Sequence, residues 1–368
     1  MSIDRPDVFF RSIHPKENTV GNVILERYFP NAGLRQSHIS PNKLASIASQ
    51  AYLVPDIFFS VARFNGQRLL LNFEQTSAVY VQIPVNADPE YIIKVYNLLD
   101  KYFIPLPTSI IDDGSLLTLF WVLKNPLYRH EFYKVYLLHK AISRILAIYN
   151  NSITGHLSVD FITRLIGTIN SQNNKTVSLL RHTGRVLSNE QLENVLLKQF
   201  GADEYQKLQK HATIIQELLA LFSDRFWTNS GRPELFEEWL IYFGASMSYF
   251  CEPKQLKKEM IALAESLEAY PWIKIKHQYD DLTTTIAENS RGGYLNHKGV
   301  RLVLNGDNWL DIISNRLNIT QSEVDTLGLY ILGRINYRNP SFQPALQKVH
   351  TIGSNQFVAT EVLLMKQA

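Results

Sequence analysis

The chain has 368 residues, of which 45% are hydrophobic, 11% aromatic and 19% charged. This length predicts two or three domains, and the composition is that of a globular protein with well-formed cores. The single cysteine, Cys251, excludes an intramolecular disulfide and a cysteine-based zinc site. The sequence contains no apolar run long enough for a membrane span and no apolar signal-peptide core at its N-terminus, so we expect a cytoplasmic protein.

The net charge of +3 is unevenly distributed along the chain. Between Trp121 and Leu187 nine lysine and arginine residues accompany two acids, whereas residues 188–290 carry ten basic and sixteen acidic side chains. A basic segment beside an acidic one predicts one surface that meets polyanions and another that does not. A solvated charged face would produce the same pattern and stays open as an alternative.

The first half of the chain predicts an α/β domain. Residues 56–61 and 78–84 are rich in β-branched and aromatic side chains, which favour strands, and residues 108–123 predict an apolar hairpin. Asp113 and Gly114 have the residue types of the turn in this hairpin.

Helices are predicted between these strands. Ser40 and Pro41 match an N-cap and a first helical position. Apolar residues recur at helical spacing after Asp88-Pro89 and again over residues 129–149. The polar face of the second helix is expected to carry four basic residues, which are Arg129, Lys134, Lys140 and Arg144.

After residue 187 the pattern is helical. Ser188 with Gln191, and later Thr320 with Glu323, are predicted to form capping boxes. The predicted helices of this half cover residues 192–200, 204–222, 230–244, 253–269, 309–317 and 321–333. The last two have the length and short connection of a helix-turn-helix. They predict either a plain helical hairpin or a DNA-reading unit that uses Arg301, Arg316, Arg334 and Arg338.

We therefore predict three domains. Residues 1–187 form an α/β domain, residues 188–288 a helical domain, and residues 289–368 a small C-terminal unit that is helical or similar to a helix-turn-helix.

Three stretches of the α/β half resemble the archaeo-eukaryotic-type primase domain found in replication proteins of plasmids and other mobile elements. They are residues 56–85, 107–121 and 160–170, and the resemblance covers about residues 50–185. It implies a domain built on an RRM-like antiparallel or mixed sheet, with a cleft for nucleotidyl transfer.

The positions where this family places its chemistry hold different residue types here. Two acids at i and i+2 of a strand emerge on one face and can share two divalent ions, but the matching positions are Gln82 and Pro84. Thr118 occupies the place of a phosphate-contacting histidine, and Asp160 is the nearest counterpart of a third acid. We predict that nucleotidyl transfer has been lost and that the chain holds no metal. The alternative is an active primase that uses relocated carboxylates with Mg²⁺ or Mn²⁺.

Basic and amide side chains around the third stretch suit contacts to phosphate oxygens, which position a strand without reading its sequence. The candidate nucleic-acid-binding residues are Arg129, Lys140, Arg144, Arg164, Asn170, Lys175, Arg181 and Arg185. A solvated rim is the alternative interpretation of this group.

The sequence thus predicts a DNA-replication protein of a plasmid, phage or other mobile element. It would bind single-stranded or origin DNA, without a membrane partner, and position a helicase or initiator of the same element. A scaffold that binds such a protein without any DNA remains the third hypothesis.

Overall fold

The computed structural model of this chain describes residues 6–15, 20–29, 33–85, 90–147, 159–227, 235–250, 253–266, 286, 294–297, 300–303 and 309–333. The chain forms two compact units, Met1–Gln209 and Lys210–Ala368. The division falls later than the boundary expected after residue 187, because helix α5 (Asn189–Phe200) packs on helix α4 (Phe132–Leu146) of the first unit.

A five-stranded antiparallel sheet is the centre of the first unit, in the order β11-β6-β7-β5-β4. Strands β5 and β7 contain the apolar segments predicted as strands. Both are longer than predicted at the end of the pair where Thr76 of β5 lies opposite the buried Leu127 of β7. Its strands are β4 (Arg63–Phe64), β5 (Phe73–Pro84), β6 (Ser109–Asp112), β7 (Leu116–Tyr128) and β11 (Ser178–His182).

A second, four-stranded antiparallel sheet has the order β2-β1-β3-β8. Its strands are β1 (Val23–Phe29), β2 (Gly33–Ile39), β3 (Ile57–Ser60) and β8 (Ile162–Arg164). A short pair, β9 (Ile169–Asn170) and β10 (Lys175–Thr176), follows β8. The predicted 56–61 strand and the third primase-like stretch are therefore neighbours in this sheet.

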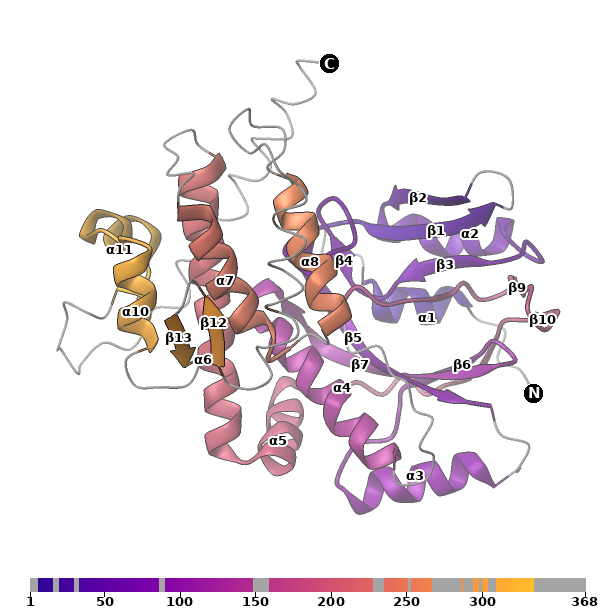
Figure 1. The fold of residues 1–368 in the computed structure, drawn as a ribbon. Helices are drawn as coiled ribbons and strands as arrows, with labels where there is room; N and C mark the ends of the chain where they lie inside the picture. The colour runs from indigo at the N-terminus through magenta and orange to yellow at the C-terminus, as the bar shows by residue number, and fades with distance from the viewer. Residues whose placement is uncertain are drawn as a thin grey trace. The chain divides into compact units, whose positions relative to one another are not determined.

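The main core lies between the two sheets, where Figure 1 shows helix α1 (Pro6–Ile13). The ring of Phe9 in α1 contacts Phe59 of the four-stranded sheet and Phe120 of the five-stranded sheet, at centroid distances of 6.5 and 5.2 Å. Helix α2 (Leu44–Gln50), preceded by a 3-10 turn at Pro41–Lys43, adds Leu44 and Ala48 to this core. The helix start at Pro41 is confirmed, but the Ser40 side chain makes no capping hydrogen bond.

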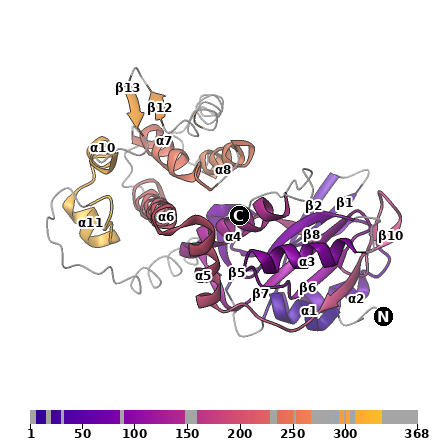
Figure 2. The same ribbon diagram turned by 90° about the horizontal axis from the view of Figure 1, so that it is seen from below.

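Helices α3 (Tyr91–Lys101) and α4 cover the other face of the five-stranded sheet (Figures 1 and 2). The predicted helix start at Asp88-Pro89 lies outside the described residues. Helix α4 packs on the sheet and also on α3 and α5, so it is buried on most sides. The expected exposure of Lys134 is therefore wrong: it is 8% exposed and binds Glu131 and Glu193 at 2.9 and 2.6 Å.

The second unit is mainly helical and begins at Lys210, within α6 (Ala202–Phe222). Its core includes an aromatic cluster: Trp239 stacks on Phe236 and Phe243, and its indole N–H donates to the Leu218 carbonyl at 2.8 Å. The described elements are a π-helical turn (Ser223–Trp227), α7 (Phe236–Met247), α8 (Pro253–Ser266), β12 (Tyr294–His297), β13 (Val300–Val303), α10 (Trp309–Arg316) and α11 (Gln321–Leu327).

The last helix pair is shorter than predicted. Helix α11 begins with the expected capping box, in which Thr320 accepts from the Glu323 amide, but it ends at Leu327 instead of residue 333. Gly328 stops it in the left-handed conformation, with φ of 66°, a common way for a helix to end.

The predicted fold class, an α/β first part with antiparallel sheets followed by helices, is confirmed, with the β12–β13 hairpin as an addition. Among the described helices, none has the length and apolar character required to cross a membrane.

Candidate functional site

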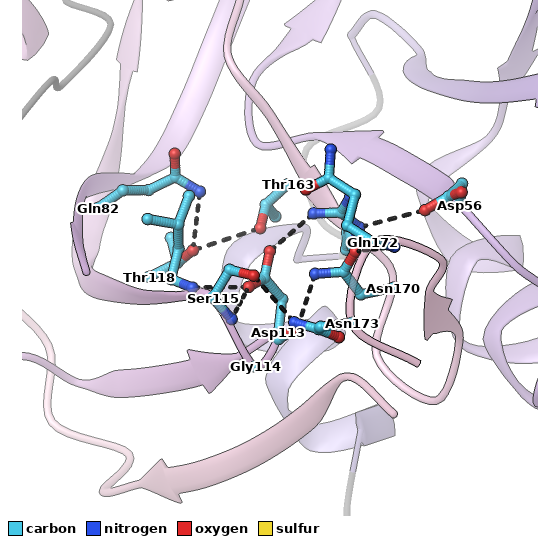
Figure 3. Close-up of polar contacts among 12 residues, drawn as sticks. Asp56, Gln82, Asp113, Gly114, Ser115, Thr118, Thr163, Asn170, Gln172 and Asn173 are labelled. Carbon is cyan, nitrogen blue, oxygen red and sulfur yellow. Dashed lines mark hydrogen bonds and ion pairs between the residues drawn. The ribbon is translucent and has the colours of Figure 1, made fainter. Parts of the chain in front are cut away.

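Two of the four positions that the primase resemblance singles out meet in the centre of the first unit. Gln82 on β5 and Thr118 on β7 are direct partners in the antiparallel ladder, so their side chains share one face. The Gln82 amide donates to the Thr118 hydroxyl at 3.2 Å, and the Thr118 and Thr163 hydroxyls lie 3.4 Å apart (Figure 3). These three side chains, which we call the neutral line, join both sheets through uncharged groups.

Pro84 ends strand β5, two residues after Gln82 and opposite Leu116. The two positions lie on the same face of the strand because side chains alternate along it. Proline has no side-chain oxygen or nitrogen that could bind a cation. The strand geometry expected for an acid pair is therefore present, without the acids.

Asp160, which the resemblance predicts as the nearest counterpart of a third acid, is 6% exposed and binds an arginine. Its carboxylate lies 3.5 Å from the Arg68 guanidinium, which also binds the Asp160 carbonyl and the Glu26 carboxylate, the latter at 2.9 Å. The side chain stands beside Tyr80 of β5, whose pKa is raised well above its usual value, chiefly by burial and further by Asp160, although Arg68 opposes the rise. Asp160 thus belongs to an ion-pair cluster with Arg68 and Glu26.

Two other acids of this region, Asp113 and Asp56, accept hydrogen bonds from backbone amides and from the guanidinium group of Arg164. One oxygen of Asp113 accepts the amides of Ser115 and Leu116 at 2.9 and 2.7 Å, which supports the turn expected in the β6–β7 hairpin. The other binds Arg164 at 2.8 Å. Within the described part of the chain, no three histidine, cysteine, aspartate or glutamate side chains are grouped as a metal site would need.

Arg164 and Asn170, both predicted to contact nucleic acid, are built into the same network. The Arg164 side chain is 12% exposed, binds Asp113 and Asp56, and covers the Phe58 ring at 4.9 Å. Asn170 is fully buried and donates to the Asp113 carbonyl at 2.9 Å. Their polar groups therefore have partners inside the protein.

The short β9–β10 hairpin is joined to the β6–β7 turn by hydrogen bonds from Asn173 (Figure 3). Asn173 donates to the Asp113 carbonyl at 3.2 Å and to the Ser115 hydroxyl at 2.9 Å. A Cβ on Gly114, which has φ of 84°, would lie 2.5 Å from the Lys175 side chain, so only glycine fits this turn. Lys175, which was predicted to contact nucleic acid, therefore lies beside the turn that Asp113 stabilises.

The remaining basic candidates of this region differ in exposure. Lys175 and Arg185 are exposed to solvent. Arg181 is half-buried, with its guanidinium 5.1 Å from the centre of the Tyr96 ring. Lys175 and Arg185 are therefore the members of the 164–185 group with the most accessible charge.

The basic residues of the α4 region are arranged differently from the predicted single face. Arg129 precedes the helix and binds the Phe73 carbonyl and the Glu74 carboxylate, both at 3.0 Å. Burial raises the pKa of Glu74, although the Arg129 charge opposes the shift. Lys140 and Arg144 lie 5.9 and 5.3 Å from the Phe200 ring of α5, with Arg144 exposed.

In the second unit, the start of α11 is held by a buried arginine. Arg225, 3% exposed, binds both oxygens of Glu323 at 2.6 and 2.8 Å and donates to the Leu317 and Asn318 carbonyls. Arg316 forms an ion pair with Glu238 at 3.2 Å. Of the other arginines predicted for a DNA-reading unit, Arg334 and Arg338 and the side chain of Arg301 lie outside the described residues.

Sequence reasoning missed Thr163, Arg68 and Glu26 as members of the site. Thr163 lies within the third primase-like stretch and is 4% exposed. Its hydroxyl was the only sequence feature that could have indicated a role in the site. Arg68 and Glu26 come from different parts of the chain and gave no local pattern. Their pairing depends on the placement of the segment before β5 against strand β1.

No family model and no curated protein matches this sequence. Among solved structures, the chain is similar to the primase-polymerase domain of cyanophage S-2L, with 12% identity, a TM-score of 0.38, and coverage of 52% of this chain and 97% of the other. It is also similar to the primase RepB', with 12% identity, a TM-score of 0.34, and coverage of 78% and 96%. The catalytic domain of RepB' in complex with initiator DNA gives 9%, 0.33, and coverage of 52% and 89%. All three are described as primases.

Proposed function

We propose that this chain is a DNA-replication protein of a plasmid, phage or other mobile element, whose primase-like domain binds DNA but no longer transfers nucleotides. The observation that carries the proposal is the hydrogen bond of 3.2 Å between Gln82 and Thr118. The sequence resemblance matches these residues to the positions where the primase family uses an acid and a phosphate-contacting histidine. The domain would act in the cytoplasm, beside a helicase or initiator of the same element.

The loss of nucleotidyl transfer follows from charge. Two divalent ions that bridge a triphosphate and a primer hydroxyl must be held by several carboxylate oxygens of the protein. Neutral groups alone cannot do this, because such ions bind their own water molecules strongly. Gln82 offers a neutral amide that already donates to Thr118, and Pro84 offers no ligand. The carboxylate of Asp160 is paired with Arg68 at 3.5 Å, and Arg68 also binds Glu26 at 2.9 Å. The neutral line therefore lacks the negative charge that such ions require.

Binding of DNA is supported by the accessible cations of residues 164–185. Lys175 and Arg185 are exposed, and Lys175 packs against Gly114 in the turn that the Asp113 network holds. Residues 121–187 carry nine basic side chains against two acids, although Arg129, Lys134 and Arg164 are paired with carboxylates inside the protein. Exposed cations attract the phosphate backbone of a strand whatever its sequence.

A paired assay on the purified full-length protein tests both halves of the proposal. Fluorescence polarisation with labelled single-stranded DNA should show binding that weakens as salt rises. Incubation with template, ribonucleotides and deoxyribonucleotides, and Mg²⁺ or Mn²⁺ should yield no primer. Primer synthesis that is abolished by Asp160→Ala but unaffected by Asp203→Ala, an exposed acid of α6, would establish an active primase and overturn the proposal.

A further inference from the structure

Two arginines of the β1–β2 hairpin lie directly opposite each other. Arg27 on β1 and Arg35 on β2 are register partners, so their side chains leave the same face of the sheet. Both guanidinium groups approach one ring, that of Phe29, at 4.6 and 5.3 Å from its centre. We call these three side chains the arginine pair and its ring.

Like charges placed directly across a ladder repel each other and destabilise the hairpin. Within the described residues, neither Arg27 nor Arg35 has an acidic partner; their side-chain contacts are to the Phe29 ring. Glu26, the nearest acid along β1, leaves the opposite face and binds Gln36 at 2.6 Å and Arg68. The repulsion between the two guanidinium groups is therefore uncompensated by a neighbouring carboxylate in this part of the chain.

The hairpin is also unusually open. Strand β2 is the edge of the four-stranded sheet, and all five residues from Leu34 to His38 are exposed, although they alternate between two faces. At the end of the hairpin, the partners Tyr28 and Leu34 are 57% and 54% exposed on the face opposite the arginines. An edge strand that is exposed on both faces contributes little to the core, so its side chains are available for a ligand.

We infer that the arginine pair and its ring bind the phosphodiester backbone of single-stranded DNA. Two guanidinium groups side by side match phosphate oxygens in charge and hydrogen-bond geometry. The exposed ring of Tyr28 leaves the opposite face of the same hairpin and is not part of this phosphate site. The inference rests on the proposed DNA-binding function and places a contact on β1–β2, away from the predicted 129–185 residues.

The test compares three forms of the full-length protein by fluorescence polarisation with labelled oligo(dT) at several salt concentrations. The first is the wild type, the second carries Arg27→Gln and Arg35→Gln, and the control carries Arg11→Gln and Lys207→Gln, which remove two exposed charges elsewhere in the first unit. We expect about tenfold or greater loss of affinity in the hairpin variant, the order for two lost charge-assisted contacts. The plot of log affinity against log salt should become shallower by about 1.4, at roughly 0.7 for each contact with a single strand.

Folding is monitored in the same samples by thermal unfolding. Removal of the arginine repulsion should leave the melting temperature of the hairpin variant unchanged or higher, so weaker DNA binding cannot come from unfolding. A third variant, Arg27→Lys with Arg35→Lys, keeps both charges and should retain the salt slope of the wild type.

Each other result has a distinct meaning. If the hairpin variant binds DNA as the wild type does, or if the control loses as much affinity, the inference is wrong while the proposed function stands. If the wild type binds no DNA at all, the proposed function fails and the inference with it. If a polyglutamate peptide competes with oligo(dT) at equal charge concentration, the hairpin is a docking site for acidic proteins and the inference is overturned.

Discussion

The Arg164 guanidinium and the Asp113 carboxylate are 2.8 Å apart, although 51 positions separate them in the chain. This ion pair connects the β8 edge of the four-stranded sheet to the β6–β7 turn of the five-stranded sheet. Asp113 also caps that turn through the Ser115 and Leu116 amides. The pair therefore links the two sheets that contribute residues to the neutral line.

Arg164→Gln should destabilise the protein by about 3 kcal/mol, because it leaves the mostly buried Asp113 carboxylate without its charged partner. Urea unfolding followed by circular dichroism measures this loss. The matched control is Arg11→Gln, which removes an exposed ion pair with Asp7 and should cost less than about 1 kcal/mol. Equal losses in the two variants would show that the Arg164–Asp113 pair does not stabilise the fold.

Lys175→Gln combined with Arg185→Gln should weaken single-stranded DNA binding without lowering stability, because both side chains are exposed. The salt dependence of the affinity should become shallower by about 1.4 for the two contacts. Arg164→Gln, in contrast, should change the unfolding midpoint and leave this slope unaltered. An unchanged slope in the Lys175 and Arg185 variant would exclude these two residues from the DNA surface.

Gln82→Asp combined with Pro84→Asp should create a cation site, since the two side chains leave one face of β5. Without metal the two carboxylates repel each other and the melting temperature should fall. Addition of Mn²⁺ should raise it again, because an ion that binds only the folded state stabilises it. The control, Gln82→Asn with Pro84→Asn, has the same shape without charge. A Mn²⁺ effect of the same size in this control would mean that the strand does not present a cation site.

Acid should weaken the second unit through Glu323. Burial alone would raise the pKa of this carboxyl, but hydrogen bonds from Arg225 and Thr320 and the Arg225 charge outweigh burial and hold the pKa at about 2, below its ordinary 4.5. The folded-state pKa is depressed, so the stabilisation is complete above pH 4.5 and is lost as pH falls through 2.

Arg225→Gln should therefore be much less stable than the wild type above pH 4.5, and the difference should shrink as pH falls to 2. Thermal unfolding across this pH range, followed by tryptophan fluorescence, checks the prediction. Glu323→Gln is the matched control and should show the same convergence with the wild type. A difference that stays constant with pH would mean that Glu323 ionisation does not contribute.

Much of the local structure followed from the sequence because it depends on neighbours along the chain. The capping boxes at Ser188 and Thr320 form between residues three positions apart and are present as predicted. The left-handed Gly328 that ends α11 is a local signal too, and it could have corrected the predicted helix length. Alternation along a strand likewise sufficed to place Gln82 and Pro84 on one face of β5.

Only the tertiary structure decided which charges are available. Lys134 was expected at the surface and is buried because α5 returns to cover α4 and brings Glu193 to it. Arg164 and Asn170 are committed to Asp113, and Asp160 to Arg68, through contacts between segments far apart in sequence. Composition and periodicity encode the identity and local conformation of a residue, whereas its partners are set by the packing of distant strands, which no local pattern contains.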